Sequence, residues 1–180
     1  MSKRIFGLLL VVCLVVGLLP VVASAAGPAD ASLKFGFTTL KLTDYDTPVY
    51  TKNYEKAEAK DTAGNTFVAY AQTTTGANEE NYNAKYEWKT GEEAPTLTLR
   101  NFKLDEYNND TGKLIGKVED GEYTTTAVQT YSITTSKNVP TKIVLEGENL
   151  IEAKFGITYY NNLTIESKDD GKLKLLGVSS

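Results

Sequence analysis

Short runs in which apolar and polar side chains alternate recur along most of this chain. These runs lie at residues 32–37, 66–70, 96–99 and 172–175. Because successive side chains of a strand point to opposite faces, each run predicts a half-buried β-strand. Clusters rich in Gly, Asn and Asp separate the runs and predict turns, at 61–65, 107–112 and 168–171.

Residue usage supports the same interpretation. Residues 26–180 contain 23 Thr and 11 Tyr, two residue types that fit the pleated surface of a strand. The one helix-like segment, residues 54–60, is rich in Glu, Lys and Ala but has no apolar stripe. It fits the arm of a hairpin as well as an exposed helical turn. The sequence therefore predicts an all-β protein.

The first 25 residues differ from the rest of the chain. Lys3 and Arg4 are followed by an uncharged apolar run at 5–19, by Pro20, and by the small residues at 23–25. This order is typical of a signal peptide, and the run is shorter than the roughly 20 residues of a membrane-spanning helix. Cys13 follows Val12 within the apolar run, which argues against a lipoprotein attachment site. We expect cleavage near Ala25, a secreted or cell-surface protein, and no membrane association of the mature chain.

Charge and missing residue types exclude several classes of function. Residues 26–180 carry 17 basic and 23 acidic side chains, no His and no Cys, and Arg100 is their single Arg. An acidic chain lacks the basic field of a nucleic-acid-binding protein. Disulfides, thiol nucleophiles, imidazole bases and His/Cys zinc sites are excluded as well.

Downstream of about residue 90, similar short sequence segments repeat at a regular spacing. Ser132 and Ile133 precede Gly156 and Ile157 by 24 residues, and Leu99 precedes Leu145 by 46, about two such periods. A period in the twenties built of short strands and Asn/Gly turns indicates a β-solenoid. We expect a parallel β-helix in this part, with a β-sandwich as the alternative.

In such a coil, the residues of the segment 143–151 have expected structural roles. Ile143 and Leu145 should point inward and Val144 outward, by strand alternation. Gly147 should adopt the bent or left-handed backbone of a corner. Asn149 should lie at that corner, where its amide can bond neighbouring backbone groups.

The segments 81–88, 96–101, 143–149 and 156–165 together resemble secreted bacterial surface proteins typical of Gram-positive anaerobes. These proteins are described as carbohydrate-binding-domain or adhesin-like. The resemblance covers about residues 81–180, and the Leu-Glu-Gly-Glu-Asn phrase at 145–149 is its most distinctive part. It implies a right-handed parallel β-helix and binding of a polysaccharide or cell-wall glycan. Family members that bind sugars through calcium use a dense acidic cluster, which this sequence lacks, so we expect no cofactor.

We therefore expect three parts: a signal peptide at 1–25, an irregular β section or cap at 26–90, and β-helix repeats at 91–180. The chain stops a few residues after a repeat strand, at 172–175, with no helix, Pro or charge block to cap it. An uncapped solenoid end exposes backbone groups and core side chains. This favours further repeats beyond Ser180, with end-to-end association with another molecule as the alternative.

Candidate catalytic and metal-binding groups are few. Glu146 and Glu148 alternate and could act as an acid/base pair, although a solvated strand face explains them better. The acidic residues at 105–110 and 168–171 lack EF-hand spacing and fit polar turns. Arg100 offers a proton-abstracting group for a polysaccharide lyase only as a guess. We expect no catalytic residue and no metal site, with a β-helix lyase or hydrolase as the alternative function.

Aromatic side chains are the remaining candidates for a ligand site. In the alternating segment 81–89, Tyr82, Tyr86 and Trp88 are predicted to share one strand face, which suits either core packing or a flat platform for a sugar ring. Tyr159 and Tyr160 are predicted to lie in an exposed turn. We expect a non-enzymatic module that binds glycan, with these five residues as weak candidates.

Overall fold

The computed structural model describes residues 26–36, 38–60, 64, 66–105, 116–119, 122–125, 131–153 and 155–177. The predicted signal peptide, the turn at 107–112 and most of the acidic segment 105–110 lie outside the described residues. The helical structure within them is a single 3₁₀ turn, η1 (Pro28–Asp30). None of the described helices is long and apolar enough to cross a membrane.

The described residues form thirteen strands, so the all-β prediction is confirmed. In chain order the strands are β1 (Ser32–Phe35), β2 (Thr38–Lys41), β3 (Val49–Lys60), β4 (Thr66–Thr73), β5 (Ala84–Glu87), β6 (Thr96–Arg100), β7 (Lys103–Asp105), β8 (Gly116–Glu119), β9 (Glu122–Thr125), β10 (Tyr131–Thr135), β11 (Thr141–Ala153), β12 (Phe155–Thr158) and β13 (Leu163–Gly177).

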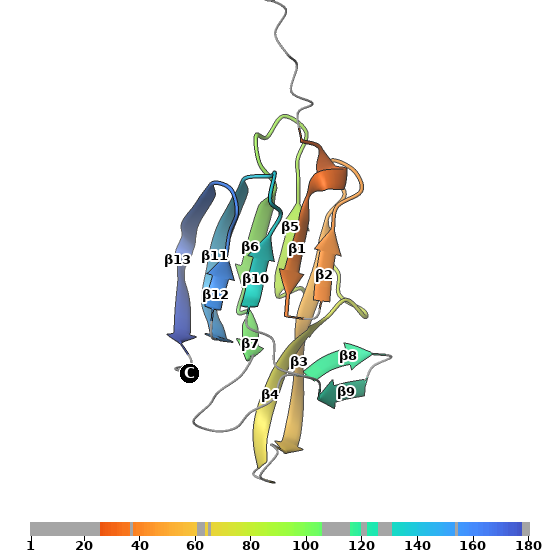
Figure 1. Cartoon of the computed structure of the whole chain (residues 1–180), viewed down its shortest axis with the longest axis vertical. Helices are drawn as coiled ribbons and strands as arrows, with labels where there is room; N and C mark the ends of the chain where they lie inside the picture. The colour runs from red at the N-terminus through yellow and green to blue at the C-terminus, as the bar shows by residue number, and fades with distance from the viewer. Residues whose placement is uncertain are drawn as a thin grey trace, which may run out of the picture.

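Two sheets face each other (Figure 1). Sheet A has the strand order β12-β10-β1-β2, and sheet B has the order β13-β11-β6-β5-β3-β4, with β7 also paired to β11. The hairpin of β8 and β9 stands apart as a third, small sheet. Both large sheets are open and mix parallel with antiparallel pairs, which is consistent with the β-sandwich alternative; a parallel β-helix is not shown.

One hydrophobic core fills the space between the sheets. Leu33, Phe35 and Ile133 enter it from sheet A, and Leu97 and Ile143 enter it from sheet B, all of them fully buried. The predicted boundary at residue 90 divides neither sheet, because β1 pairs with β10 and β5 pairs with β6. The sections 26–90 and 91–180 are therefore joined in the same core.

The repeated phrases occupy stacked parallel strands. Ile133 on β10 lies opposite Ile157 on β12, 24 residues later. Leu99 on β6 lies opposite Leu145 on β11, 46 residues later. The register that the sequence period predicted is thus the pairing register of these strands.

Two local predictions have different outcomes. The segment 54–60 lies at the end of β3, which pairs with β4, so the hairpin-arm interpretation is confirmed. The predicted turn at 168–171 is wrong, because these residues belong to the continuous strand β13. Asp169 and Asp170 have positive φ angles of 52° and 60°, and they form a bulge that bends β13 without ending it.

The bend in β13 lies beside similar bends in the strands stacked on it. Glu146 on β11 is opposite both Arg100 on β6 and Lys168 on β13. The next residue of each strand has a positive φ: 48° at Asn101, 65° at Gly147 and 52° at Asp169. The corner expected at Gly147 is confirmed, and it runs through three strands.

Asn149 holds this corner together from inside. Its side chain is buried, and its Oδ1 accepts a hydrogen bond from the Phe102 N–H at 2.9 Å. Its Nδ2 donates to the carbonyl oxygens of Glu146 at 3.2 Å and Lys172 at 3.0 Å. One amide thus serves the backbone of β11, of β13 and of the link between β6 and β7, as expected from the sequence, although the left-handed Asn of the corner is Asn101.

Further amides extend this arrangement across sheet B. The Asn101 Oδ1 accepts from the Glu148 N–H, and the Asn53 Oδ1 accepts from the Lys103 N–H. We call the set formed by Asn53, Gln72, Asn83, Asn101 and Asn149 the amide belt. Its members bond to one another or to the backbone between β4 and β13, with distances of 2.8–3.4 Å.

Replacing Asn149 by Ala should destabilise the protein by about 2 kcal/mol, because the buried Phe102 N–H and the facing carbonyls would lose their partner. Urea denaturation monitored by tryptophan fluorescence would measure the loss. Asn138 is an exposed Asn on the loop before β11, and Asn138→Ala is the matched control, with an expected change within about 0.5 kcal/mol. Equal stability of the two variants would contradict the role given to Asn149.

Candidate functional site

The outer face of sheet B, turned away from the core, carries a ladder of charged and polar side chains. Alternation sends Leu97, Leu99, Ile143 and Leu145 into the core, so their neighbours on β6, β11 and β13 face outward. Strand register aligns the outward residues in rungs, which are Thr96–Lys142–Thr164, Thr98–Val144–Glu166 and Arg100–Glu146–Lys168. Val144 faces outward as predicted.

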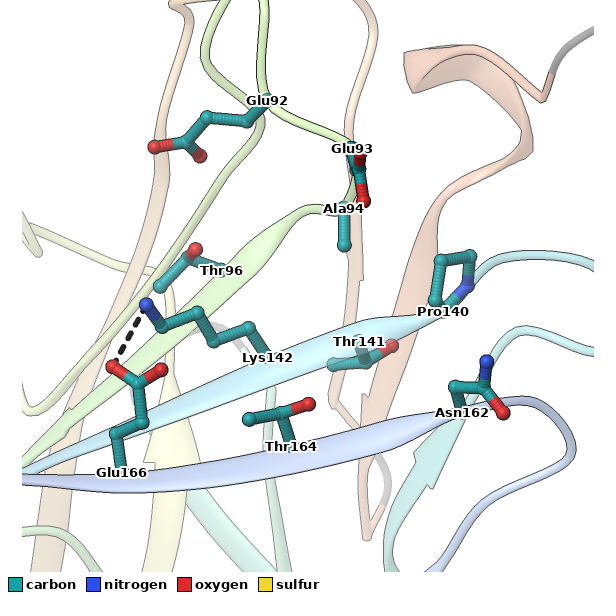
Figure 2. Close-up of a pocket in the computed structure, with 10 residues that line it drawn as sticks. All are labelled: Glu92, Glu93, Ala94, Thr96, Pro140, Thr141, Lys142, Asn162, Thr164 and Glu166. Atoms are coloured by element: carbon teal, nitrogen blue, oxygen red, sulfur yellow. Dashed lines mark ion pairs between the residues drawn. The ribbon is translucent and has the colours of Figure 1, made fainter.

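Two adjoining hollows of about 330 Å³ each lie over these rungs. They share Glu92, Thr96 and Lys142, and we call them together the outer groove. Figure 2 shows the hollow nearer the loops, whose lining includes Glu92 and Glu93 from the segment before β6 and Lys142 and Glu166 from β11 and β13. The second hollow extends from Lys142 to the Arg100–Glu146–Lys168 rung.

The Arg100–Glu146–Lys168 rung is the most tightly bonded part of the outer groove. Arg100 Nε lies 2.8 Å from Glu146 Oε2, and Lys168 Nζ lies 2.8 Å from Glu146 Oε1. The Arg100 guanidinium also lies over the ring of Tyr82, 4.1 Å from its centroid. Burial alone would raise the pKa of Glu146, but the hydrogen bonds from Lys168 and Arg100 outweigh burial and lower it.

A second charged cluster borders the groove on β5. Lys85 Nζ lies 3.1 Å from Glu87 Oε1 and 3.7 Å from Glu79 Oε1. The Tyr50 hydroxyl donates to Glu79 Oε2 at 2.7 Å. Burial, together with this bond to Glu79, raises the pKa of Tyr50 to about 12, so its hydroxyl stays protonated. The hydrogen bond from Tyr50 lowers the pKa of Glu79.

The loop between β5 and β6 carries the upper rim of the groove and is fastened at two points. The Trp88 Nε1–H donates to the Glu92 carbonyl oxygen at 2.9 Å. Asp46 accepts from the Thr90 hydroxyl at 2.7 Å and from the Thr90 N–H at 3.1 Å, and these bonds lower the pKa of Asp46. Below the loop, Lys142 and Glu166 form an ion pair at 2.8 Å across β11 and β13 (Figure 2).

The outer groove presents both hydrogen-bond donors and hydrogen-bond acceptors to a polar ligand. Ionised carboxylates only accept, and ammonium and guanidinium groups only donate. Every shifted carboxyl of the described residues, on Asp46, Glu79 and Glu146, has its pKa lowered, the opposite of what a general acid requires at neutral pH. Among the described residues, no group of three or more His, Cys, Asp or Glu side chains is placed to hold a metal ion.

The aromatic candidates from the sequence divide into three groups. Tyr86 and Trp88 lie in the core, so an exposed platform at these two residues is wrong, because their rings fill the space between the sheets. Burial raises the pKa of Tyr86, whose hydroxyl has no hydrogen-bond partner among the described residues. Tyr159 and Tyr160 are 59% and 54% exposed in the turn between β12 and β13.

Tyr82 does not share the face of Tyr86 as predicted. It precedes β5, in a bend at 81–83 that interrupts the alternation, and it packs against Arg100 and Lys85 of the outer groove. Its side chain is 4% exposed. Tyr82 thus supports the cations of the groove from below and offers little ring surface to a ligand.

Glu146 and Glu148 do not form a carboxylate pair in one hollow. The bend at Gly147 separates them. Glu146 lines the outer groove, whereas Glu148 lines a different hollow with Lys103 and Lys172, beyond the amide belt. The sequence favoured a solvated strand face over an acid/base pair, and the left-handed backbone at Gly147 is the reason that the two carboxylates lie apart.

Sequence reasoning missed most of the groove. Lys85, Glu79, Lys142 and Lys168 were not singled out, and Arg100 was considered only as a candidate base. The usable signal was the spacing of 46 residues between Leu99 and Leu145, since the same offset places Arg100 beside Glu146. Charged residues that look ordinary in the sequence can be assigned to one site only once the strand register is known.

Comparisons of the chain with protein-family models, with curated proteins and with solved structures found no match. The class that the structure defines is an all-β protein of two facing mixed sheets with a charged outer groove. Any functional conclusion therefore depends on the residues of this chain.

The protein should lose stability as the pH falls below 4.5, the ordinary pKa of Glu. Glu146 has a lowered pKa in the folded state, so its contribution is present above the pKa of the unfolded chain. That contribution is lost as the pH falls through the folded pKa. Replacing Glu146 by Gln should lower stability at pH 7 and flatten the acid limb of the curve.

Urea midpoints measured between pH 7 and pH 3 would test this expectation. Asp46 and Glu79 also have lowered pKa values, so part of the acid dependence should remain in the Glu146→Gln variant. Glu80→Gln is the matched control, since Glu80 is exposed and lies outside the ion pairs described above. An acid limb of unchanged steepness in Glu146→Gln would contradict the assignment.

Proposed function

We propose that the protein is a non-enzymatic module that binds a polysaccharide or cell-wall glycan in the outer groove. The single observation that carries the proposal is the ordered ladder of donors and acceptors across β6, β11 and β13, which lies beneath two adjoining hollows. Sugar hydroxyls both donate and accept hydrogen bonds. A surface that presents fixed carboxylates beside fixed cations can satisfy both capacities.

Charge balance in the groove favours a ligand with little net charge. Its two hollows are lined by five cationic and six anionic side chains: Lys85, Lys89, Arg100, Lys142 and Lys168, and Glu79, Glu87, Glu92, Glu93, Glu146 and Glu166. A strongly anionic polymer would meet no cationic field here. A neutral glycan strand would exchange hydrogen bonds with water for hydrogen bonds with these groups.

The ion pairs also supply preorganisation. Glu146 is held by two cations and Lys85 by two carboxylates, so their side chains are ordered before a ligand arrives. Ordering long side chains at the moment of binding costs about 0.5–1.5 kcal/mol for each of them. A groove whose charged side chains are already fixed avoids much of that cost.

The alternative of a β-helix lyase or hydrolase finds less support in this geometry. A proton-abstracting Lys or Arg needs a lowered pKa. Burial would lower the pKa of Lys85, but the hydrogen bond and charge of Glu87, together with the charge of Glu79, outweigh burial and raise it. The hydrogen bond to Glu146 raises the pKa of Arg100 in the same way. These groups are suited to hold charge and to donate hydrogen bonds.

We further propose that the chain is exported by its first 25 residues and acts outside the cell. The sequence argument is their order of positive, apolar and small residues, which is typical of a signal peptide. The resemblance to carbohydrate-binding and adhesin-like surface proteins supports the same location. We also propose that residues 91–180 wind as a parallel β-helix. The parallel pairs of β6 with β11, β11 with β13 and β10 with β12 support this winding.

Purified peptidoglycan and insoluble neutral polysaccharides should retain the protein in a pull-down assay, with no release of reducing or unsaturated sugar ends. Replacing Lys142, which both hollows share, by Ala should weaken retention about tenfold through loss of a charged donor. Retention on the neutral polysaccharides should change little with salt, since a neutral ligand has no Coulomb attraction to screen.

Lys41→Ala is the matched control, because Lys41 is an exposed Lys on β2, in the other sheet. It should bind as the unaltered protein does. Equal retention of the Lys142 and Lys41 variants, or no retention on any of these glycans, would overturn the proposal. Product formation would favour the enzymatic alternative.

A further inference from the structure

The two sheets end on the same side, at the last two strands of the described chain. β12 is the edge of sheet A and β13 is the edge of sheet B (Figure 1). Within the described residues, no strand pairs with the free edge of either one. An edge strand presents a row of unpaired N–H and C=O groups and is a template for pairing with another chain.

The hydrophobic core is open between these two edges. Ile165 and Leu175 occupy inward positions of β13, opposite Ile143 and Ile151 of β11. Their partners on β11 are fully buried, whereas Ile165 is 47% and Leu175 is 51% exposed. Together with Ile157 they line an apolar hollow of about 390 Å³. Large apolar side chains exposed along an open edge mark an interaction surface.

The order of charges along β13 selects the direction of pairing. On its outward face, Glu166 precedes the bend and Lys174 follows it. In an antiparallel pair with a two-fold axis at Asp170, Glu166 of one copy lies opposite Lys174 of the other. The same register sets Ile165 opposite Leu175 of the second copy. A parallel, in-register pair would instead place each charge opposite its own kind, which is unfavourable.

The bend of β13 fits the same axis. The left-handed residues Asp169 and Asp170 lie at the centre of the antiparallel register, so the bend of one copy coincides with the bend of the other. This register also brings Lys168 near Lys172 of the second copy. Lys168 is already bonded to Glu146 of its own chain, which offsets its charge.

We propose that a second copy of this chain covers the open edge, by antiparallel pairing of β13 with β13 across a two-fold axis. The contact is isologous and closes on itself, so it produces a dimer and no filament. It would cover the exposed Ile165 and Leu175 and would extend sheet B from one copy into the next. The proposal does not depend on glycan binding.

Sedimentation velocity of the chain without residues 1–25, which lie outside the described fold, would test the dimer over a concentration series. We expect a monomer–dimer equilibrium. Glu166→Lys alone and Lys174→Glu alone should each raise the dissociation constant about tenfold, since each places like charges opposite one another twice per dimer. The double variant, Glu166→Lys with Lys174→Glu, should restore dimerisation.

The restoration separates a contact between copies from a role within one chain, because Glu166 also pairs with Lys142 of its own chain. Lys41→Glu, on the edge strand β2 at the far side of sheet A, is the control and should leave the equilibrium unchanged. A monomer at every concentration, assemblies that grow beyond dimers, or a double variant no better than the single ones would each overturn the proposal.

Discussion

The buried amide of Asn149 is the interaction on which the rest of sheet B depends. Beside Asn149, β6 ends and β7 begins, β11 bends at Gly147, and β13 has a bulge at Asp169 and Asp170. Each irregularity takes backbone groups out of the regular ladder, and buried backbone groups without partners are costly. Asn149 supplies a donor and an acceptor to these groups at once, and the other members of the amide belt do the same toward β4.

The position of the belt determines where the charged surface can form. Arg100, Glu146 and Lys168 are each the last residue before a left-handed position, and the common register of the three bends makes them neighbours. A shift of one residue in any of the three strands would turn its side chain toward the core. The outer groove is thus a consequence of the corner. The free edge of β13 bends at the same corner, and the axis of the proposed dimer passes through that bend.

Much of this fold could be predicted from the residues alone. Alternation at 96–99 and 143–145 gave the correct inward and outward faces, and the 24- and 46-residue offsets gave the pairing register of Ile133 with Ile157 and of Leu99 with Leu145. The antiparallel half was not predictable in the same way. Its strands carry no repeat, and their partners are chosen by packing between sections far apart in sequence, as in the pairing of β1 with β10.

The candidate site was predicted less well, for physical reasons that individual residues illustrate. Tyr82 does not share the strand face of Tyr86, because a bend precedes β5. The alternating pattern of residues does not reveal that bend. Glu148 left the face of Glu146 because a left-handed Gly lies between them. The cations of the groove are unremarkable in sequence, since a Lys or Arg on a strand is ordinary until its neighbours on adjacent strands are known.

Native-state hydrogen exchange of the amides that donate to the amide belt is the most direct test of this account. The N–H groups of Phe102, Lys103 and Glu148 donate to the side chains of Asn149, Asn53 and Asn101, respectively. If the belt holds sheet B together, these three amides should exchange as slowly as those in the centre of β11. Exchange at the rate of exposed loop amides would show that the belt opens freely and would contradict the account.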